Sequence, residues 1–441
     1  MKTQETTVTP INGGFGDPNF AKNKKEPVHR WAPWVAGFSK TFVESAIDKH
    51  LHSPGTVLDP FCGVGTTLLC AIYHGHKAIG FEINPYAVLA STVKTNAHKI
   101  NSKELEKEIC RFEVFNEKGQ VGEPKSKSPV GFKTKTEFYS PLVLKKVLFV
   151  RDFIDTIKNT EIRGLFNLAL GATLVKYSNY SYEPSLGTRE GAGKEKILEY
   201  DVGAAILAKL KEMLVDIREV SQSPQEGKVG NAEIVCDSFF NYEGYPSLAN
   251  SVDLIITSPP YLNNYHYVRN TRPQLFWLEL VSSSKELKQL ETDNFGKYWQ
   301  TVRQGEKIEL EPALKDPEIV ACIEAIRKVN PERGIYGGSG WANYVTEYLN
   351  DCYRFAKGID YCLKSGGIAA VVIGNNVIQG VEVPTDVFLG KIAEKVGLEL
   401  VKIHVPREKR IGNSIIHSTA RIGKAKKKTQ LYESVVELRK P

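Results

Sequence analysis

The stretch VLDPFCGVGTTLLCAIYHGHKAIGFEI constrains the fold more than any other part of this chain. Its first apolar run ends at Asp59, and a turn with two glycines, Gly63 and Gly65, follows. A helix is predicted to start near Thr66, and a second apolar run ends at Glu82. A strand, a tight turn, a helix and a second strand form a βαβ unit, in which the two strands lie parallel in one sheet.

Further apolar, β-branched runs recur along the chain and predict the rest of the sheet. Together with the first two, they cover residues 56–59, 78–83, 233–238, 252–257, 367–374, 398–405 and 432–439. Continuous apolar strands with helical patterns between some of them predict a mostly parallel α/β sheet that is covered on both faces. No helical pattern links the last two runs, so these can pair as a hairpin and give the sheet an antiparallel edge strand.

Two connections in this sheet are too long for simple crossovers. About 150 residues separate the second and third runs, and about 110 separate the fourth and fifth, so each connection is expected to contain a folded insertion. Helical periodicity predicts helices at 141–157, 164–177, 313–329 and 343–359. Polar stretches predict exposed loops at 181–196 and 332–340.

Composition narrows the class of protein. Of the 441 residues, 41% are hydrophobic and 25% are charged, as in soluble globular proteins. The sequence has no run of about 18 apolar residues, so no membrane span is predicted. The N-terminus lacks the apolar core of a secretory signal. The seven cysteines are odd in number and form no CxxC pair, which favours a reducing, cytoplasmic location and indicates neither disulfides nor a metal site.

Basic residues concentrate near the C-terminus. The chain carries a net charge of +7, and the segment from Glu408 to Gln430 alone carries +6. Its basic residues are Lys409, Arg410, Arg421, Lys424, Lys426, Lys427 and Lys428. A phosphate backbone would attract such a segment, although the same composition also suits a solvated loop.

The βαβ unit has the features of a site for an adenosine-type ligand. Glycines let the backbone approach a ligand, the helix N-terminus faces it, and Glu82 can bond both hydroxyls of a ribose. A dinucleotide site would need a third glycine where Leu68 stands, and the charge of Asp59 would repel a pyrophosphate. An acid at that place suits a positive amine or sulfonium, which favours S-adenosylmethionine as the cofactor.

Three motifs together resemble the DNA amino-methyltransferases, which methylate N4 of cytosine or N6 of adenine. These motifs are DPFCGVGTT, GFEINPYAV and, further along, TSPPY. The resemblance implies a seven-stranded, Rossmann-like methyltransferase sheet with helical insertions. It also implies a cofactor site formed by Asp59, Pro60, Phe61, Cys62, Gly63, Gly65, Thr66, Thr67, Glu82, Ile83, Asp237 and Ser238. Segment 30–47 stands where this family has a helical segment that closes over the cofactor; an ordinary amphipathic helix is the alternative.

In this family the corner after the fourth strand is catalytic, which assigns catalysis to Ser258, Pro259, Pro260 and Tyr261. The Ser258 hydroxyl and the Pro259 carbonyl would accept the N–H groups of an exocyclic amine, and the proline ring keeps that carbonyl oriented. Tyr261 would offer a face on which an extruded base stacks. The chain has no Pro-Cys dipeptide, the nucleophile that marks the family methylating C5 of cytosine.

The identity of Ser258 favours cytosine N4 as the target, because the adenine enzymes more often have Asp or Asn at this position. Methylation of adenine N6 is the first alternative, and an RNA amino-methyltransferase, such as one acting on tRNA, is the second. A DNA-binding subunit without catalysis is a third alternative, against which the intact corner argues. The expected partners are double-stranded DNA and, in a restriction–modification system, a cognate endonuclease.

Three regions are candidates for contact with DNA. Residues 262–280 follow the corner and are aromatic and basic, with Arg269 and Arg272 available for phosphate or guanine contacts; a helix packed into the core is the alternative. Residues 178–190 form a second candidate. The basic segment adds Lys409, Arg410, Lys426 and Lys427.

The expected organisation follows from these assignments. Residues 1–100 and 231–441 would form the catalytic methyltransferase domain, residues 101–230 a helical insertion, and residues 262–345 a second insertion within the catalytic domain. Either insertion could carry target recognition.

Overall fold

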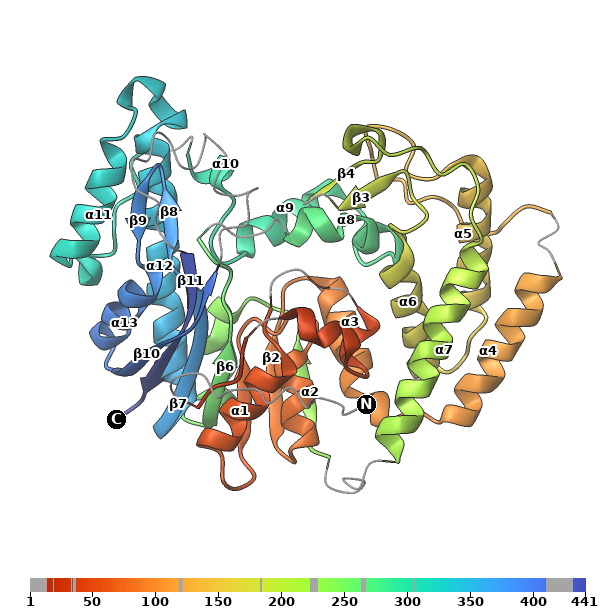
Figure 1. Cartoon of the computed structure of the whole chain (residues 1–441), viewed down its shortest axis with the longest axis horizontal. Coiled ribbons are helices and arrows are strands. Elements are labelled where there is room, and N and C mark those ends of the chain that lie inside the picture. The colour runs from red at the N-terminus through yellow and green to blue at the C-terminus, as the bar shows by residue number, and fades with distance from the viewer. Residues whose placement is uncertain are drawn as a thin grey trace, which may run out of the picture.

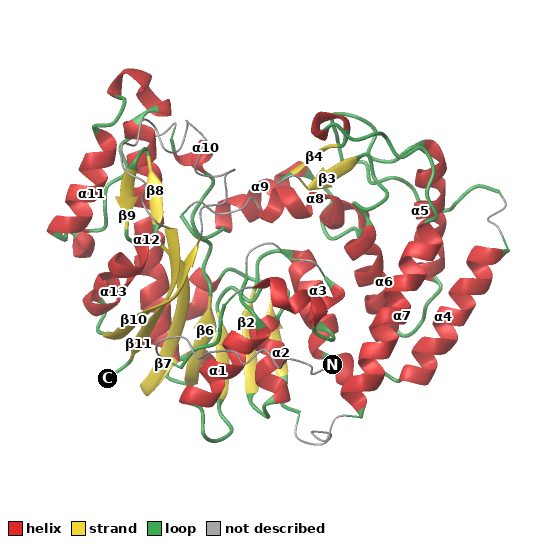
Figure 2. Ribbon diagram, in the orientation of Figure 1, coloured by secondary structure: helices red, strands yellow, loops and turns green. Residues whose placement is uncertain are grey.

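A seven-stranded sheet forms the centre of the molecule in this computed structural model (Figures 1 and 2). The structure describes residues 14–18, 20–32, 34, 37–118, 122–182, 185–222, 229–262, 267–303, 306–409 and 431–441. The strands, in spatial order, are β10 (Glu399–Lys409), β11 (Leu431–Arg439), β7 (Leu363–Gly374), β6 (Val252–Thr257), β1 (Thr56–Asp59), β2 (Lys77–Phe81) and β5 (Ala232–Val235). Each of the seven apolar runs corresponds to one of these strands, which confirms the predicted α/β fold.

The sheet is parallel except at β11. That strand pairs antiparallel with both β7 and β10, whereas the other neighbouring strands are parallel. The predicted hairpin of the last two strands is therefore confirmed. Because β11 inserts between β10 and β7, the antiparallel strand lies one place inside the edge, and β10 forms the edge itself.

Helices cover both faces of the sheet, which explains why its strands are apolar without alternation. Along β6, Leu254 and Ile256 pack into one hydrophobic cluster and Ile255 packs into the other. The first cluster contains residues of α1 (Lys40–His50), α2 (Thr66–Tyr73) and α3 (Pro85–Thr95), and the second contains residues of α12 (Gly338–Cys362) and α13 (Thr385–Lys395).

The connection between β2 and β5 contains a group of helices that stands to one side of the sheet (Figure 1). Its elements are α4 (Ser102–Glu117), α5 (Pro141–Asp155), α6 (Thr160–Thr173), β3 (Tyr180–Tyr182), β4 (Leu186–Thr188) and α7 (Val202–Ser221). The side chains of Asn101, Asn159 and Asp201 cap the N-termini of α4, α6 and α7. The predicted helices at 141–157 and 164–177 are confirmed as α5 and α6. The loop expected at 181–196 is wrong in part, since it includes the β3–β4 hairpin.

The connection between β6 and β7 contains a second group of helices. They are α8 (Tyr267–Trp277), α9 (Ser284–Asp293), α10 (Trp299–Val302), α11 (Pro317–Arg327) and the long α12, which returns the chain to the sheet. The predicted helices at 313–329 and 343–359 are confirmed as α11 and α12. The loop expected at 332–340 is wrong, because a 3-10 helix, η8 (Pro331–Tyr336), and the first turn of α12 occupy it. Leu275, Phe276 and Trp277 of α8 are buried, so this part of residues 262–280 packs into the core.

Shorter elements complete the fold. They are the 3-10 helices η1 (Phe20–Lys25), η2 (His29–Trp31), η3 (Ala97–Lys99), η4 (Glu190–Ala192), η5 (Phe239–Gly244), η6 (Pro246–Leu248) and η7 (Pro312–Leu314), and the strands β8 (Asn376–Ile378) and β9 (Val381–Val383). Among the described residues no helix is both long and apolar enough to cross a membrane.

Candidate active site

A pocket lies at the carboxyl ends of the central strands, where parallel α/β sheets bind their ligands. Asp59 ends β1, Glu82 follows β2, Asp237 stands two residues after β5, and Ser258 follows β6. All four line this pocket, whose unfilled volume, open to solvent, is about 900 Å³. The strand ends therefore bring together side chains from sequence positions nearly 200 residues apart.

The glycine turn after β1 shapes one wall of the pocket. The backbone N–H of Gly63 donates to Oε2 of Glu82 at 3.0 Å, which ties the turn to the end of β2. Gly65 has a φ of +81°, and a Cβ there would lie 2.9 Å from the Cβ of Ser91 in α3. Only glycine satisfies both conditions, because the backbone is left-handed and α3 approaches it closely.

Two carboxyl groups face the pocket, and burial raises the pKa of both. Asp59 is buried and accepts hydrogen bonds from the Thr257 hydroxyl at 2.7 Å and the Phe61 N–H at 3.0 Å, and burial raises its pKa to about 6. Glu82 accepts from the N–H of Asn84 at 2.8 Å, and burial raises its pKa to about 7. Burial disfavours the ionised form of each acid. A cation or hydroxyl donors bound in the pocket would stabilise that ionised form.

Asp237 is held by the turn that follows β5. Its Oδ1 accepts from the Ser238 N–H at 2.7 Å and from the Asn241 amide at 2.8 Å, and its Oδ2 accepts from the Tyr245 hydroxyl at 2.9 Å. These bonds fix the carboxylate at the pocket edge, where Ser238 also lies.

The predicted cofactor residues gather as expected at this one place. Every one of them lines the pocket except Gly65 and Thr67. Gly65 shapes the turn behind the wall, and the Thr67 hydroxyl donates to the Ile256 carbonyl at 3.3 Å, which joins α2 to β6. A buried acid beside a glycine turn, with a second acid on the next strand, fits the cationic amino-acid end and the ribose of S-adenosylmethionine.

Only part of the corner after β6 lines the pocket. Ser258 and Pro260 line the pocket, whereas Pro259 and Tyr261 are not part of its lining. The Tyr261 hydroxyl lies 3.4 Å from Oε1 of Glu433, and its ring packs near Gly374. Burial raises the pKa of Tyr261 well above its usual value. Its role as a stacking face for a base stays a prediction.

One stripe of helix α12 supports this corner. The Tyr348 hydroxyl donates to the Pro260 carbonyl at 3.0 Å, and the Tyr344 hydroxyl donates to the Leu262 carbonyl. One turn further on, Asp351 accepts the Gly296 N–H at 3.0 Å. Residues at these spacings share one helix face, so a single face of α12 holds both the corner and the loop beside it.

The N-terminal segment forms one wall of the pocket. The sequence indicated segment 30–47 for this place but not which of its residues line the pocket. Of segment 30–47, Trp34, Gly37 and Phe38 line the pocket, and Phe20 joins them from η1. In the described part of that segment the α-helix begins only at Lys40. The lining residues therefore come from the non-helical chain before it.

The second connection also contributes to the pocket. Tyr267 and Val268 of α8 line it, as do Asp293, Asn294 and Phe295 after α9. The rings of Trp34 and Tyr267 stack at 5.8 Å with an interplanar angle of 17°. Tyr267 and Val268 belong to residues 262–280, which the sequence had indicated as a DNA-contact region. No motif identified Asp293, Asn294 and Phe295, because a loop that reaches a site from far along the chain carries no fixed spacing.

The predicted DNA-contact residues have different surroundings. Arg269 is exposed on α8. Arg272 donates to the Lys133 carbonyl at 2.5 Å and lies over the ring of Phe132 at 5.4 Å. Lys409 ends β10, but its side chain, like Arg410, Lys426 and Lys427, lies outside the described residues. DNA contact by these residues stays a prediction.

The two predicted DNA-facing regions adjoin each other. The Tyr182 hydroxyl of the β3–β4 hairpin donates to the Asn270 carbonyl of α8 at 2.8 Å, and the Leu186 N–H donates to the Asn270 side chain at 3.2 Å. The β3–β4 hairpin of the first connection therefore meets α8 of the second connection (Figure 1).

The sheet order, the glycine turn and the two acids at the strand ends are the arrangement expected of an S-adenosylmethionine-dependent methyltransferase. A family model described as DNA methylase, of the N6 and N4 type, matches residues 2–92. The type II methyltransferase M.BsoBI of Geobacillus stearothermophilus is 25% identical over 436 residues, covering 90% of this chain and 83% of its own. The type II methyltransferase M.AvaI of Nostoc sp. is 25% identical over 420 residues, covering 88% and 82%.

Among solved structures, the rRNA methyltransferase aviRa of Streptomyces viridochromogenes aligns with a TM-score of 0.30 and 9% identity, over 95% of this chain and 92% of that chain. The fold is therefore assigned from the strand order alone. The family model and these relatives support the resemblance of this chain to the DNA amino-methyltransferases.

Proposed function

We propose that this protein transfers a methyl group from S-adenosylmethionine to N4 of cytosine in double-stranded DNA. One observation carries the proposal: Ser258, directly after β6, lines the same pocket as Asp59 and Glu82. The proposed acceptor site and the proposed cofactor site are thus continuous. The serine at this place favours cytosine over adenine.

The cofactor site would work through charge and shape. S-adenosylmethionine, when bound, supplies an electrophilic methyl group on a sulfonium. Asp59 would hold the cationic amino-acid end, and Glu82 would accept hydrogen bonds from the ribose hydroxyls. Trp34 and Tyr267, stacked over this side of the pocket, would exclude water from the reacting atoms, which strengthens electrostatic interactions there.

The corner would prepare the amine. The lone pair of an exocyclic amine is delocalised into the base, so it is a weak nucleophile until it is turned out of the ring plane. The Ser258 hydroxyl and the Pro259 carbonyl would accept its two N–H bonds and direct the lone pair toward the methyl group, a contribution that depends on positioning. Tyr348 binds the next carbonyl, that of Pro260, and so fixes the orientation of the whole corner.

The target base would have to leave the duplex to reach this corner. Tyr261 would then stack on the base, and the two inserted regions, 101–230 and 262–345, would contact the flanking DNA. Exposed Arg269 would bind phosphate or guanine. The named relatives are type II methyltransferases, so a restriction–modification system with a partner endonuclease is the proposed setting.

A transfer assay tests this function. The protein is incubated with labelled S-adenosylmethionine and duplex DNA, and the DNA is digested to nucleosides. Label is expected in N4-methyldeoxycytidine. Label in deoxyadenosine alone would overturn the choice of base, and label only in an RNA substrate would overturn the choice of nucleic acid.

A further inference from the structure

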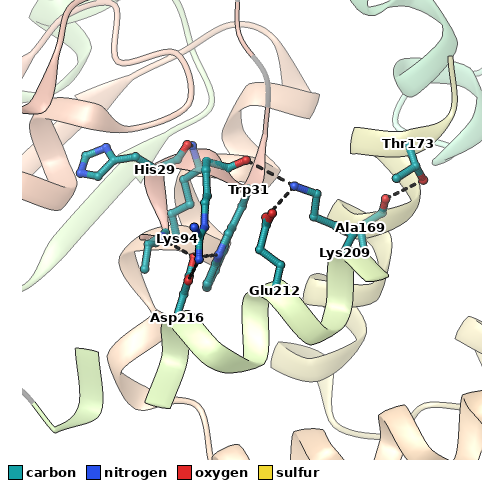
Figure 3. A network of polar contacts seen from close by, with 10 residues as sticks. His29, Trp31, Lys94, Ala169, Thr173, Lys209, Glu212 and Asp216 are labelled. Atoms are coloured by element: carbon teal, nitrogen blue, oxygen red, sulfur yellow. Dashed lines mark hydrogen bonds and ion pairs between the residues drawn. The ribbon is translucent and has the colours of Figure 1, made fainter. Parts of the chain in front are cut away.

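One carboxylate of the first insertion binds the N-terminal segment (Figure 3). Asp216, on helix α7, is fully buried. It accepts the Val28 N–H at 2.9 Å, the Trp31 indole N–H at 2.8 Å and the Arg30 Nε–H at 3.1 Å, and it also pairs with the outer nitrogen of Arg30. Four donor groups from three residues, Val28, Arg30 and Trp31, thus meet on one side chain.

The backbone at Val28 shows how strongly this contact constrains the segment. Val28 has a φ of +63°, a region that a β-branched residue rarely adopts. Such a conformation persists only where the surroundings impose it, and these sites are often ligand clamps. The N–H of Val28 itself donates to Asp216, so the carboxylate holds the residue that is strained.

Two lysines hold the same segment by its carbonyl groups. Lys94 of α3, a buried residue, donates to the His29 carbonyl at 3.1 Å. Lys209 of α7 donates to the Arg30 carbonyl at 3.4 Å and pairs with Glu212 at 2.7 Å. The segment is therefore fixed between the helix that follows Glu82 and the last helix of the insertion (Figure 3).

The fixed segment leads directly into the pocket wall. Trp34 stands three positions after Trp31 and lines the pocket. Its indole nitrogen lies 3.1 Å from the place where a Cβ of Gly63 would stand, so it packs on the glycine turn. Trp34 also stacks on Tyr267. Trp34 therefore follows closely in sequence on residues 28–31, which Asp216 binds.

We propose that Asp216 is a positioning residue for cofactor binding, which makes the first insertion a structural part of the cofactor site. It acts through segment 28–31, which sets the place of Trp34 over the glycine turn. The inference rests on the assignment of this pocket to S-adenosylmethionine. It assigns the insertion a role in addition to any contact with DNA.

A matched control exists inside the same insertion. Asp152 of α5 accepts the Lys125 N–H at 2.7 Å and the Ser126 N–H at 2.7 Å. It is also a carboxylate that holds a loop by backbone N–H groups, but neither it nor that loop lines the pocket. Asp152→Ala therefore removes a comparable clamp without touching the N-terminal segment.

Calorimetric titration with S-adenosylmethionine, without DNA, tests the proposal at a temperature where melting curves show each variant folded. Asp216→Ala is expected to weaken binding at least tenfold. Asp216→Asn keeps one acceptor oxygen and should fall between it and the wild type. Asp152→Ala should stay within twofold of the wild-type affinity.

At saturating cofactor, the methylation rate of Asp216→Ala should stay within about threefold of wild type. Wild-type affinity in folded Asp216→Ala, with only a lower melting temperature, would overturn the proposal.

A second variant covers the case in which Asp216→Ala does not fold. Trp31→Phe keeps a buried aromatic ring but removes the N–H bonded to Asp216, and it should weaken cofactor binding about threefold or more. Unchanged affinity in this variant would then overturn the proposal. A wild-type protein that binds the cofactor but methylates no DNA would instead contradict the proposed function, and the binding comparison would stand.

Discussion

The two walls of the active-site pocket are held by different parts of the chain. On the cofactor side, the N-terminal segment that carries Trp34 is bound to Asp216 of α7 in the first insertion. On the side of the corner, Tyr348 and Asp351 of α12 bind the Pro260 carbonyl and the Gly296 N–H. The strands place the reactive groups, but separate helices fix the two walls.

This difference predicts that the two sides of the pocket control different properties. Disturbing the cofactor wall should change the affinity for S-adenosylmethionine, whereas disturbing the corner should change the rate of transfer. A pocket held by one element would lose both properties together. Variants on the two sides of the pocket should therefore separate cofactor affinity from the rate of transfer.

Ser258→Ala removes one of the two acceptors that would bind the target amine. Transfer is expected to fall by about 100-fold or more, because a positioned acceptor at the reacting group contributes on this scale. Cofactor affinity, measured by titration, should stay near the wild-type value. A variant that lost both transfer and cofactor binding would place Ser258 in the cofactor site instead.

Asp59→Ala should have the largest effect on the cofactor side. Removing a buried carboxylate that would pair with the cationic end of the cofactor should cost about 2–3 kcal/mol of binding, or roughly 30- to 150-fold in Kd. Equilibrium titration measures the change. Normal binding by this variant would show that the pocket has been assigned to the wrong ligand.

The pH dependence of cofactor affinity should follow the same carboxyl group. The pKa of Asp59 is raised to about 6 by burial, and a cationic ligand binds the ionised form. Affinity should therefore be constant above pH 7 and fall about tenfold between pH 7 and pH 5, as protonation removes the charge. The dependence should be much weaker in Asp59→Asn, whereas an unchanged profile in that variant would point to Glu82, whose pKa is raised to about 7.

Tyr348→Phe tests the corner wall without altering a residue that touches the substrate. It leaves the buried Pro260 carbonyl without its hydroxyl partner, which costs about 1–3 kcal/mol in local stability. The rate of transfer is expected to fall about tenfold while cofactor affinity is retained. Tyr353→Phe, a change of another α12 tyrosine, which lies beside Lys357, is the matched control and should leave the rate unchanged.

Arg269→Ala should have the smallest effect. Loss of one exposed cation at the DNA face is expected to weaken DNA binding a few-fold and to reduce the salt dependence of affinity by about one unit of slope. Binding measured over a series of salt concentrations gives both values. An unchanged slope would remove Arg269 from the DNA interface.

The sequence predicted the sheet and most of the pocket because both depend on local patterns. A buried parallel strand is a short apolar run, and the residue that ends it stands at the ligand-binding edge. Asp59, Glu82, Asp237 and Ser258 were found in this way, since each stands at the end of such a run or directly after it. The seven-stranded, Rossmann-like form of the sheet followed from the family that these motifs resemble.

The supports of the pocket could not be predicted in the same way. Asp216 meets Val28 across 188 positions of sequence, and Tyr348 meets Pro260 across 88, and no local spacing records such contacts. Several helices were also not predicted, and α4 and α7 show the reason. Only Leu105, Ile109 and Phe112 of α4 are buried, so its apolar stripe is narrow within a charged segment, and α7 was not recognised although it is amphipathic.

Whether the two walls of the pocket act separately is decided by one paired measurement. Cofactor Kd by titration and the single-turnover rate of methyl transfer at saturating cofactor are measured for Asp216→Ala and Tyr348→Phe on the same DNA duplex. We expect a raised Kd with a nearly normal rate for Asp216→Ala, and a normal Kd with a reduced rate for Tyr348→Phe. Parallel changes of Kd and rate in both variants would contradict this expectation.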